Sequence, residues 1–507
     1  MVKKILLGLL VVVMLSLVGI GVYVWQFDID DYRTDLENQL QQATGFDVQI
    51  VGGLGMQTSP DLQLVANDVR FAMQDREYLD LNNVTVTVAW KPFLQRELQV
   101  MSVEMANATV SLWQDAEGNW LFPEPEKATE PESPPPAAAA ALPLKRAILD
   151  RFAIDNLQVA MHRLGDTPER LLSLSDVEFE LHNLLLADDA QLLIDQWPEY
   201  LERVPLKSTL NIRQIIAGGH AFNDLALTAA NTGSTIDLGL LLKAYGGSFA
   251  NNTAVNWLSD KLSIDTELSA DTLRLSQLLQ AFELEQKGEG LLELNFDGAT
   301  AFDPRVPDQS LANLVGNLVL EGDGLVVEGL DVDRLVNGLL KSQEMTLTDI
   351  GGFALAGPLA LLVTKGGNYT GALQGALAGE TRIPALLTEL KIADQKVNFQ
   401  DVALATDSNR VAVAGHLNLM DQTYGPIEVQ ILNESGCELF GTKLKGPLDA
   451  PEIAAAELAA ASVLNPLLSL AKKSQALVNE CKPVYQGKIA HPVKPGNGEQ
   501  GAVLQEH

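Results

Sequence analysis

The sequence is poor in the residues on which nucleic-acid-binding proteins and most metalloenzymes depend. In 507 residues it has six histidines and two cysteines, and 35 Lys and Arg face 66 Asp and Glu, a formal net charge of −31. Nucleic-acid binding requires basic surface that displaces counterions from phosphates. The acidic balance therefore argues against nucleic acid as a partner and against polybasic docking on anionic lipid head groups. Its simplest consequence is solubility.

Combinations of residues that mark a catalytic or metal centre are also missing. The histidines do not occur at metal-ligand spacing such as H-x-x-x-H, and there is no G-x-S-x-G nucleophile elbow. Gly436–Lys443 resembles a phosphate loop, but its Lys and Thr stand in swapped order. Asp331 and Asp333 precede a helical pattern, where capping of the helix is favoured over calcium binding. We expect no catalytic residues, no metal and no cofactor, and hence no enzymatic activity.

Long apolar runs are absent after the first 25 residues. Ile5–Trp25 is an unbroken apolar run, and as a helix it would extend about 31 Å, the thickness of a hydrocarbon core. Lys3 and Lys4 precede it, which favours a cytoplasmic N-terminus and an exported bulk of the chain. A cleaved signal peptide is the alternative, but its apolar region is usually about 7–15 residues long and ends in a small-residue cleavage site. We predict a transmembrane anchor.

The two cysteines, Cys437 and Cys481, would lie outside the cytoplasm if the anchor prediction holds. An even number of cysteines in an oxidising compartment favours a disulfide. Two buried, unpaired thiols are the alternative. A disulfide would close an interval of 44 residues and stabilise the fold by about 4 kcal/mol in the chain-entropy picture.

Period-two alternation of apolar and polar residues dominates the exported part. Strand side chains point alternately to opposite faces, so this pattern predicts strands with one apolar and one wetter face. We expect a mainly β protein with roughly 15 to 20 strands, mostly antiparallel. The clearest examples are Val84–Trp90, Ile236–Leu242, Leu292–Phe296, Val411–Leu419 and Ile427–Ile431.

Several short helices interrupt the predicted strands. Helical spacing of apolar residues and suitable end residues indicate Asp28–Gln42 with a stop at Gly45, Asp188–Glu202, Thr272–Phe282 and Asp331–Ser342. Ala454–Val478 is rich in Ala and Leu, and its apolar stretch is too short to cross a membrane. We interpret it as a helical cap on the sheet.

Composition divides the chain into six regions. Residues 123–143 are rich in Pro and charge and predict a mobile linker, and the tail after Pro483 is polar and predicted to be flexible. The regions are the anchor (1–27), a helix with strands (28–122), the linker (123–143), a β-rich region (144–453), the helical cap (454–482) and the tail (483–507).

The apolar face of the predicted strands must be covered. A sandwich or closed barrel would cover it with protein, and alternation alone favours this common solution. A long U-shaped sheet would cover it with another molecule, such as acyl chains. Alternation cannot distinguish the two arrangements.

A family resemblance shifts the interpretation from a closed core toward an open U-shaped sheet. The order of a strand pair, a short helix, further strands and a D-x-x-G-N-W turn after the anchor is similar to the start of the AsmA family. The segments that carry it are Ala43–Leu54, Pro60–Phe71, Val84–Trp90, Lys91–Leu98, Val103–Leu112 and Asp115–Trp120, and Asp323–Leu335 and Gly446–Ile453 resemble the family's C-terminal region.

The resemblance implies a Gram-negative inner-membrane protein that faces the periplasm and serves outer-membrane biogenesis. The family looks related to bridge-like lipid-transfer proteins, so the expected fold is an elongated, curved sheet with an open U-shaped groove. The expected partners are the inner membrane and phospholipid, which would move along the groove toward the outer membrane. A scaffold for outer-membrane proteins or the lipopolysaccharide pathway, contacting periplasmic assembly proteins, is the rival function.

The groove hypothesis predicts which residues line the groove. Apolar side chains on the alternating strands would contact the acyl chains, and an ordinary core position is the alternative for each of them. The predicted lining residues are Val84, Val86, Val88, Val411, Val413, Leu417 and Leu419.

Overall fold

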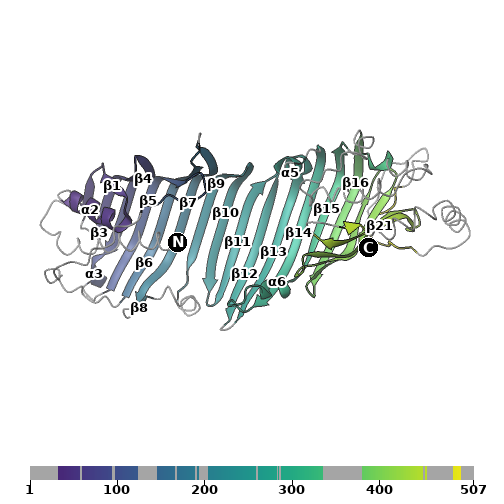
Figure 1. Ribbon diagram of the computed structural model, residues 1–507. Helices are drawn as coiled ribbons and strands as arrows, with labels where there is room; N and C mark the ends of the chain where they lie inside the picture. The colour runs from purple at the N-terminus through teal and green to yellow at the C-terminus, as the bar shows by residue number, and fades with distance from the viewer. Residues whose placement is uncertain are drawn as a thin grey trace, which may run out of the picture. The chain divides into compact units, whose positions relative to one another are not determined.

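The structure is a computed structural model (Figure 1). The predicted anchor, helical cap and almost all of the linker lie outside the residues that it describes. Within the described part of the chain, no helix is both long and apolar enough to span a membrane. The described residues are 32–57, 60–93, 97–123, 146–165, 168–188, 191–192, 204–258, 261–282, 284, 287–329, 331–334, 379–448, 452–453 and 483–492.

The chain divides into two compact units, Met1–Leu242 and Lys243–His507, and both are built mainly of strands. Unit 1 contains the helices α2 (Arg33–Thr44) and α3 (Trp90–Phe93). Its strands are β1 (Asp47–Ile50), β2 (Leu54–Gln57), β3 (Leu62–Met73), β4 (Arg76–Ala89), β5 (Glu97–Gln114), β6 (Arg146–Arg163), β7 (Glu169–Asp188), β8 (Gln191–Leu192), β9 (Lys207–Ala217) and β10 (His220–Thr232), and β11 (Thr235–Ala244) contains the boundary.

Unit 2 is built in the same way. Its helices are α5 (Leu275–Ala281) and α6 (Gln309–Ala312). Its strands are β12 (Gly247–Leu258), β13 (Lys261–Arg274), β14 (Gly288–Phe302), β15 (Val315–Glu328), β16 (Glu380–Ala393), β17 (Lys396–Ala405), β18 (Arg410–Ala414), β19 (His416–Asn418), β20 (Thr423–Leu432), β21 (Glu438–Pro447) and β22 (Glu452–Ile453).

The predicted antiparallel pairing is confirmed, with one exception among the strand pairs of the described residues. Neighbouring strands from β3 to β5 and from β6 through β7 and β9 to β10 pair antiparallel, as do those from β12 to β17 and from β20 to β22. The exception is β5 and β6, which pair in parallel. A parallel pair cannot be joined by a tight turn and needs a crossover connection. The chain provides this connection in residues 115–145, which include the Pro-rich segment.

Three helix predictions agree with the structure at least in part. Helix α2 ends at Gly45, which adopts the left-handed conformation with φ 77°, so the predicted stop is confirmed. Helix α5 is shorter than predicted, because Thr272–Arg274 extend β13. At Asp331 the side-chain Oδ1 accepts the backbone N–H of Arg334 at 2.8 Å, which is the predicted N-cap contact.

Two expectations are corrected. The described part of the predicted helix Asp188–Glu202 is strand, since Asp188 ends β7 and pairs with Gln191 of β8. The tail is not flexible throughout, because residues 483–492, here called the strap, pack against unit 2. Ile489 is 3% exposed in a cluster with residues of β16 and β17. The polar composition of the strap gave no indication of this packing.

Specific polar contacts hold the strap in place. The hydroxyl of Tyr485 donates to Asp401 Oδ1 at 2.6 Å, and the backbone N–H of Lys488 donates to Asp401 Oδ2 at 2.8 Å. The Arg410 guanidinium donates to the carbonyl of Ile489 at 3.1 Å and lies 5.1 Å from the Tyr485 ring centroid. A Cβ on Gly487 would lie 2.3 Å from Asp401 Oδ1, so a larger residue there would displace the Asp401 carboxylate.

Candidate functional site

The pairing register of unit 1 aligns apolar residues in one transverse row. Each residue lies directly opposite the next on the neighbouring strand, so their side chains share one face of the sheet. The row is Ala66, Val84, Met105, Ile154, Phe179, Leu210 and Leu227, from β3 to β10. We call this side the apolar face of unit 1.

The adjacent row, one residue along each strand, points to the other side and is mostly polar. It consists of Val65, Thr85, Glu104, Ala153, Glu180, Thr209 and Thr228. The two faces therefore differ in chemistry over seven strands. This arrangement agrees with the predicted alternation of one apolar and one wetter face.

Along the strands, the apolar face stays continuous through a local change of spacing. Ala66 and Val69 pack into the same apolar cluster although they are three residues apart, and so do Met105 and Ala108. Strict alternation would put such residues on opposite faces. The intervening Asp68 and Asn107 have φ near +50°, a conformation that Asp and Asn tolerate better than other residues with a side chain. Asn156, Asp176 and Asp224 continue this line through β6, β7 and β10 with φ 53°, 50° and 49°.

Elements of unit 1 cover one end of its apolar face. Leu36 and Leu40 of α2 pack against residues of β3 to β5, together with Val48 and Ile50 of β1, which pairs with β3. In this cluster Leu81 is 8% exposed and Ala108 is 2% exposed. This end is an ordinary hydrophobic core.

Farther along unit 1 the same face is less covered. Leu210 of β9 and Leu225 and Leu227 of β10 are partly exposed, and so are Ile215 and Phe222. Ile212 is the exception, at 6% exposed. Partly exposed apolar side chains on these two adjacent strands form a surface that an apolar ligand could cover.

Unit 2 repeats the two-faced pattern. One row on its apolar face contains Leu268, Phe296, Leu318, Leu390 and Phe399, from β13 to β17, and all five are partly exposed. The adjacent row on the other face contains Glu267, Asp297, Asn317, Lys391 and Asn398. Large apolar residues and charged residues thus occupy opposite faces here as well.

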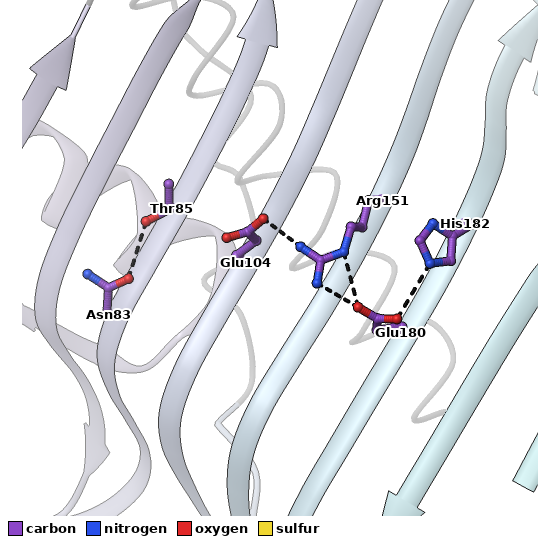
Figure 2. A network of polar contacts seen from close by, with 6 residues as sticks. All are labelled: Asn83, Thr85, Glu104, Arg151, Glu180 and His182. Carbon is purple, nitrogen blue, oxygen red and sulfur yellow. Dashed lines mark hydrogen bonds and ion pairs between the residues drawn. The ribbon is translucent and has the colours of Figure 1, made fainter.

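The polar face of unit 1 carries a charge network that Figure 2 shows. Arg151 of β6 donates to Glu104 Oε1 of β5 at 2.7 Å and, through Nε, to Glu180 Oε1 of β7 at 3.1 Å. His182 Nε2 lies 3.6 Å from the other oxygen of Glu180. The hydrogen bond from Arg151 lowers the pKa of Glu180, and the same bond raises the pKa of Arg151. With side chains about two-fifths exposed, these pairs organise the wet face and contribute little to stability.

The predicted lining residues of β4 lie on the apolar face near its covered end. Val86 is 3% exposed in a cluster with Leu98 and Val100 of β5. Val84 and Val88 are partly exposed and pack against the same cluster. Whether these three valines contact a ligand stays a prediction.

The predicted lining residues of the C-terminal region lie on short strands and at their ends. Val411 and Val413 belong to β18, and Leu417 belongs to β19. Gly415 separates the two strands with φ 137°, and a Cβ there would lie 2.4 Å from the carbonyl oxygen of Pro426. Val411, Val413, Leu417 and Leu419 are all partly exposed.

Sequence reasoning did not select the partly exposed leucines of β9 and β10. Leu210, Leu225 and Leu227 alternate as regularly as the predicted valines. Alternation identifies the face of a strand and says nothing of what lies above it. The burial of each position was needed to separate partly exposed residues such as Leu227 from buried ones such as Val86.

Cys437 lies in the described part of the chain and is 6% exposed, whereas Cys481 lies outside it. The strap meets the loop of Cys437, since the N–H of Val484 donates to the carbonyl of Gly436 at 2.9 Å. The chain segments that flank the two cysteines are therefore neighbours. The disulfide stays a prediction that agrees with this contact.

No group of three or more His, Cys, Asp or Glu side chains is placed to hold a metal ion within the described ranges. The predicted D-x-x-G-N-W turn is a hydrogen-bonded loop. Asn119 donates to Asp115 through its backbone N–H at 2.7 Å and its side-chain amide at 3.0 Å, and Gly118 has φ 88°. These bonds lower the pKa of Asp115. The turn is thus explained by local structure.

Comparison with known proteins identifies one relationship. The AsmA family matches residues 1–182, which contain α2, strands β1 to β6 and part of β7. The predicted family resemblance is confirmed for this part of the chain. Neither the curated proteins nor the solved structures gave a match.

Proposed function

We propose, from the AsmA family match of residues 1–182, that this protein binds phospholipid by its acyl chains and conducts it from the inner toward the outer membrane. In this proposal a single N-terminal anchor holds the chain in the bacterial inner membrane, with the N-terminus in the cytoplasm and the bulk in the periplasm. The protein catalyses no reaction and serves outer-membrane biogenesis.

One observation supports the lipid proposal above all. Large apolar side chains on adjacent strands remain partly exposed on one face, while the other face is charged or polar. Burial of a methylene group is worth about 0.8 kcal/mol, so even partial contact along an acyl chain would bind it firmly. Head groups would stay in water beyond the apolar rows.

A groove would join the partly exposed apolar side chains into a continuous path for acyl chains. The U-shaped groove expected from the family would let acyl chains pass from strand to strand without leaving apolar contact. Transport in one direction would need an outside driving force, because equal apolar rows bind a chain equally at every step.

The experiment compares two neighbouring residues of β10 in bacterial cells. A photoreactive amino acid is placed at Leu227, on the apolar face, or at Thr228, on the polar face. After irradiation, we expect phospholipid to be captured at position 227 and not at 228. Because the residues are adjacent in one strand, differences in expression or membrane insertion cannot produce this contrast.

The rival scaffold function gives a different result in the same experiment. A protein partner captured at position 227 without lipid would contradict the proposal and favour an assembly factor. Equal lipid capture at both positions would indicate unspecific contact with membrane and would also contradict it.

A further inference from the structure

A small polar cluster interrupts the apolar face of unit 2. Phe249 of β12 and Ala270 of β13 lie directly opposite each other in an apolar cluster. Asn251 and Thr253 follow Phe249 at alternate positions, and Thr266 lies directly opposite Thr253. These three polar side chains therefore belong to the apolar face. We call them the polar ring.

Hydrogen bonds join the three side chains in a closed cycle. Asn251 Nδ2 donates to Thr266 Oγ1 at 2.8 Å, and the Thr253 hydroxyl donates to Asn251 Oδ1 at 2.9 Å. The two threonine oxygens are 2.8 Å apart. Since Thr253 has already donated its only proton, Thr266 is the donor in this last bond.

Counting donors and acceptors shows what the ring can offer a ligand. The second N–H of the Asn251 amide donates to the carbonyl of Glu267 at 3.0 Å, so every side-chain donor of the ring is used. Each of the three side-chain oxygens accepts one hydrogen bond and has capacity for another. The ring thus presents three acceptors and no donor.

An aromatic ring lies beside these acceptors on the same face. Gly298 of β14 is directly opposite Thr266, and Gly316 of β15 is directly opposite Gly298. The Phe296 side chain fills the space above both glycines, because a Cβ on Gly298 would lie 2.5 Å from Phe296 Cζ. Aromatic faces attract cations.

The charges nearby narrow the choice of ligand. Asp265, Glu267 and Asp297 occur on the same strands, but they alternate with the apolar positions and lie on the other face. Among the described residues of β12 to β14, no acidic side chain therefore shares the face of the polar ring. A positive group whose counter-charge belongs to the same molecule fits this site better than a free cation.

We propose that the polar ring receives the primary ammonium of a zwitterionic lipid, whose three N–H donors match its three acceptors. The acyl chains would lie on the apolar rows of β13 to β16. This inference rests on the proposed lipid-binding function and specifies its substrate class. A choline head group has no N–H donor, and a glycerol head group leaves the lipid with net negative charge.

The test measures lipid selection by the full chain in detergent, using native mass spectrometry. The protein is offered equimolar phosphatidylethanolamine, phosphatidylcholine and phosphatidylglycerol with identical acyl chains. We expect phosphatidylethanolamine to be enriched about three- to tenfold over each of the others, as one or two net hydrogen bonds would give.

Two variants distinguish the specific effect of the polar ring from the general effect of losing a hydroxyl group. The double variant Thr253→Val and Thr266→Val should bind as much lipid in total and lose the enrichment. Thr388→Val is the matched control, because Thr388 lies on the same face opposite Leu320, is 7% exposed and has a hydroxyl without a hydrogen-bond partner. It should keep the enrichment.

Equal binding of the three lipids by the wild-type protein would overturn this inference and leave the proposed function intact. Enrichment that persists in a folded double variant would also overturn it. If the double variant does not fold, the ratio of phosphatidylethanolamine to the other lipids bound by the wild-type protein decides whether the inference holds. Absence of all lipid would instead contradict the proposed function.

Discussion

The two ends of the apolar face in unit 1 have the same sequence pattern and different surroundings. Leu81 of β4 is 8% exposed in a cluster with residues of α2 and β1, whereas Leu227 of β10 is partly exposed on the same face. The comparison teaches that period-two alternation records which face is apolar. Whether that face is a core or a ligand surface depends on whether another element covers it.

Matched substitutions at these two leucines should give the largest difference. Leu81→Asp would bury an unpaired carboxylate, which we expect to lower the free energy of unfolding by more than about 4 kcal/mol. Leu227→Asp leaves the carboxylate near water and should cost less than about 1.5 kcal/mol. Thermal unfolding followed by circular dichroism measures both. Similar losses in the two variants would show that the face at β10 is covered.

The strap packs against strands β16 and β17 of unit 2, and the predicted disulfide would tether it. Replacing both cysteines, Cys437→Ser and Cys481→Ser, should reduce stability by about 4 kcal/mol through the lost chain constraint. Hydrogen exchange of residues 483–492 should rise in the double variant and in reduced wild-type protein. Identical migration of oxidised and reduced protein on a denaturing gel would contradict the disulfide.

Alkaline pH should loosen the same strap. Burial, and next the hydrogen bond to Asp401, raise the pKa of Tyr485 above its ordinary value of 10.0. A group with a raised pKa stabilises the fold fully below its unfolded pKa, and that contribution is lost as pH rises through the folded value. Thermal stability should therefore fall above about pH 10, and Tyr485→Phe should lack this component. An unchanged pH profile in the variant would contradict the role of Tyr485.

The left-handed residues that keep the apolar face continuous should be sensitive to side-chain type. Asn107→Val places a β-branched residue at φ 53° and should cost about 1–3 kcal/mol. Asn107→Gly is the control, because glycine adopts this conformation freely, although it loses the hydrogen bond from Asn156 at 2.7 Å. Equal melting temperatures for Val and Gly would contradict the conformational explanation.

Substitutions on the polar face of unit 1 should reduce stability least. Arg151→Met breaks the links to Glu104 and Glu180, whose side chains are 46% and 42% exposed. We expect a loss below about 1 kcal/mol that shrinks at high salt. Melting curves at low and high ionic strength measure it. A loss as large as that of Leu81→Asp would show that this face, too, is part of a core.

Much of the architecture was predictable from local pattern. Alternation at Val84–Trp90 and Ile427–Ile431 identified strands β4 and β20, because a half-buried strand exposes every second residue to water. Gly45 gave the end of α2 because it can adopt positive φ. Asp68 and Asn107 lie where the alternation shifts by one residue. Their residue types, which tolerate positive φ, are the sequence signal for this shift.

Other features depended on contacts between distant parts of the chain. The strap reads as a polar tail, yet Tyr485 and Lys488 bind Asp401, more than 80 positions earlier. The closed cycle of Asn251, Thr253 and Thr266 requires the register of β12 with β13. By itself the sequence determined the strands, the two-faced chemistry and the resemblance of the N-terminal part to the AsmA family, since these follow from neighbours along the chain. Only the tertiary structure decided which apolar side chains are covered, because burial is a property of what packs above a strand.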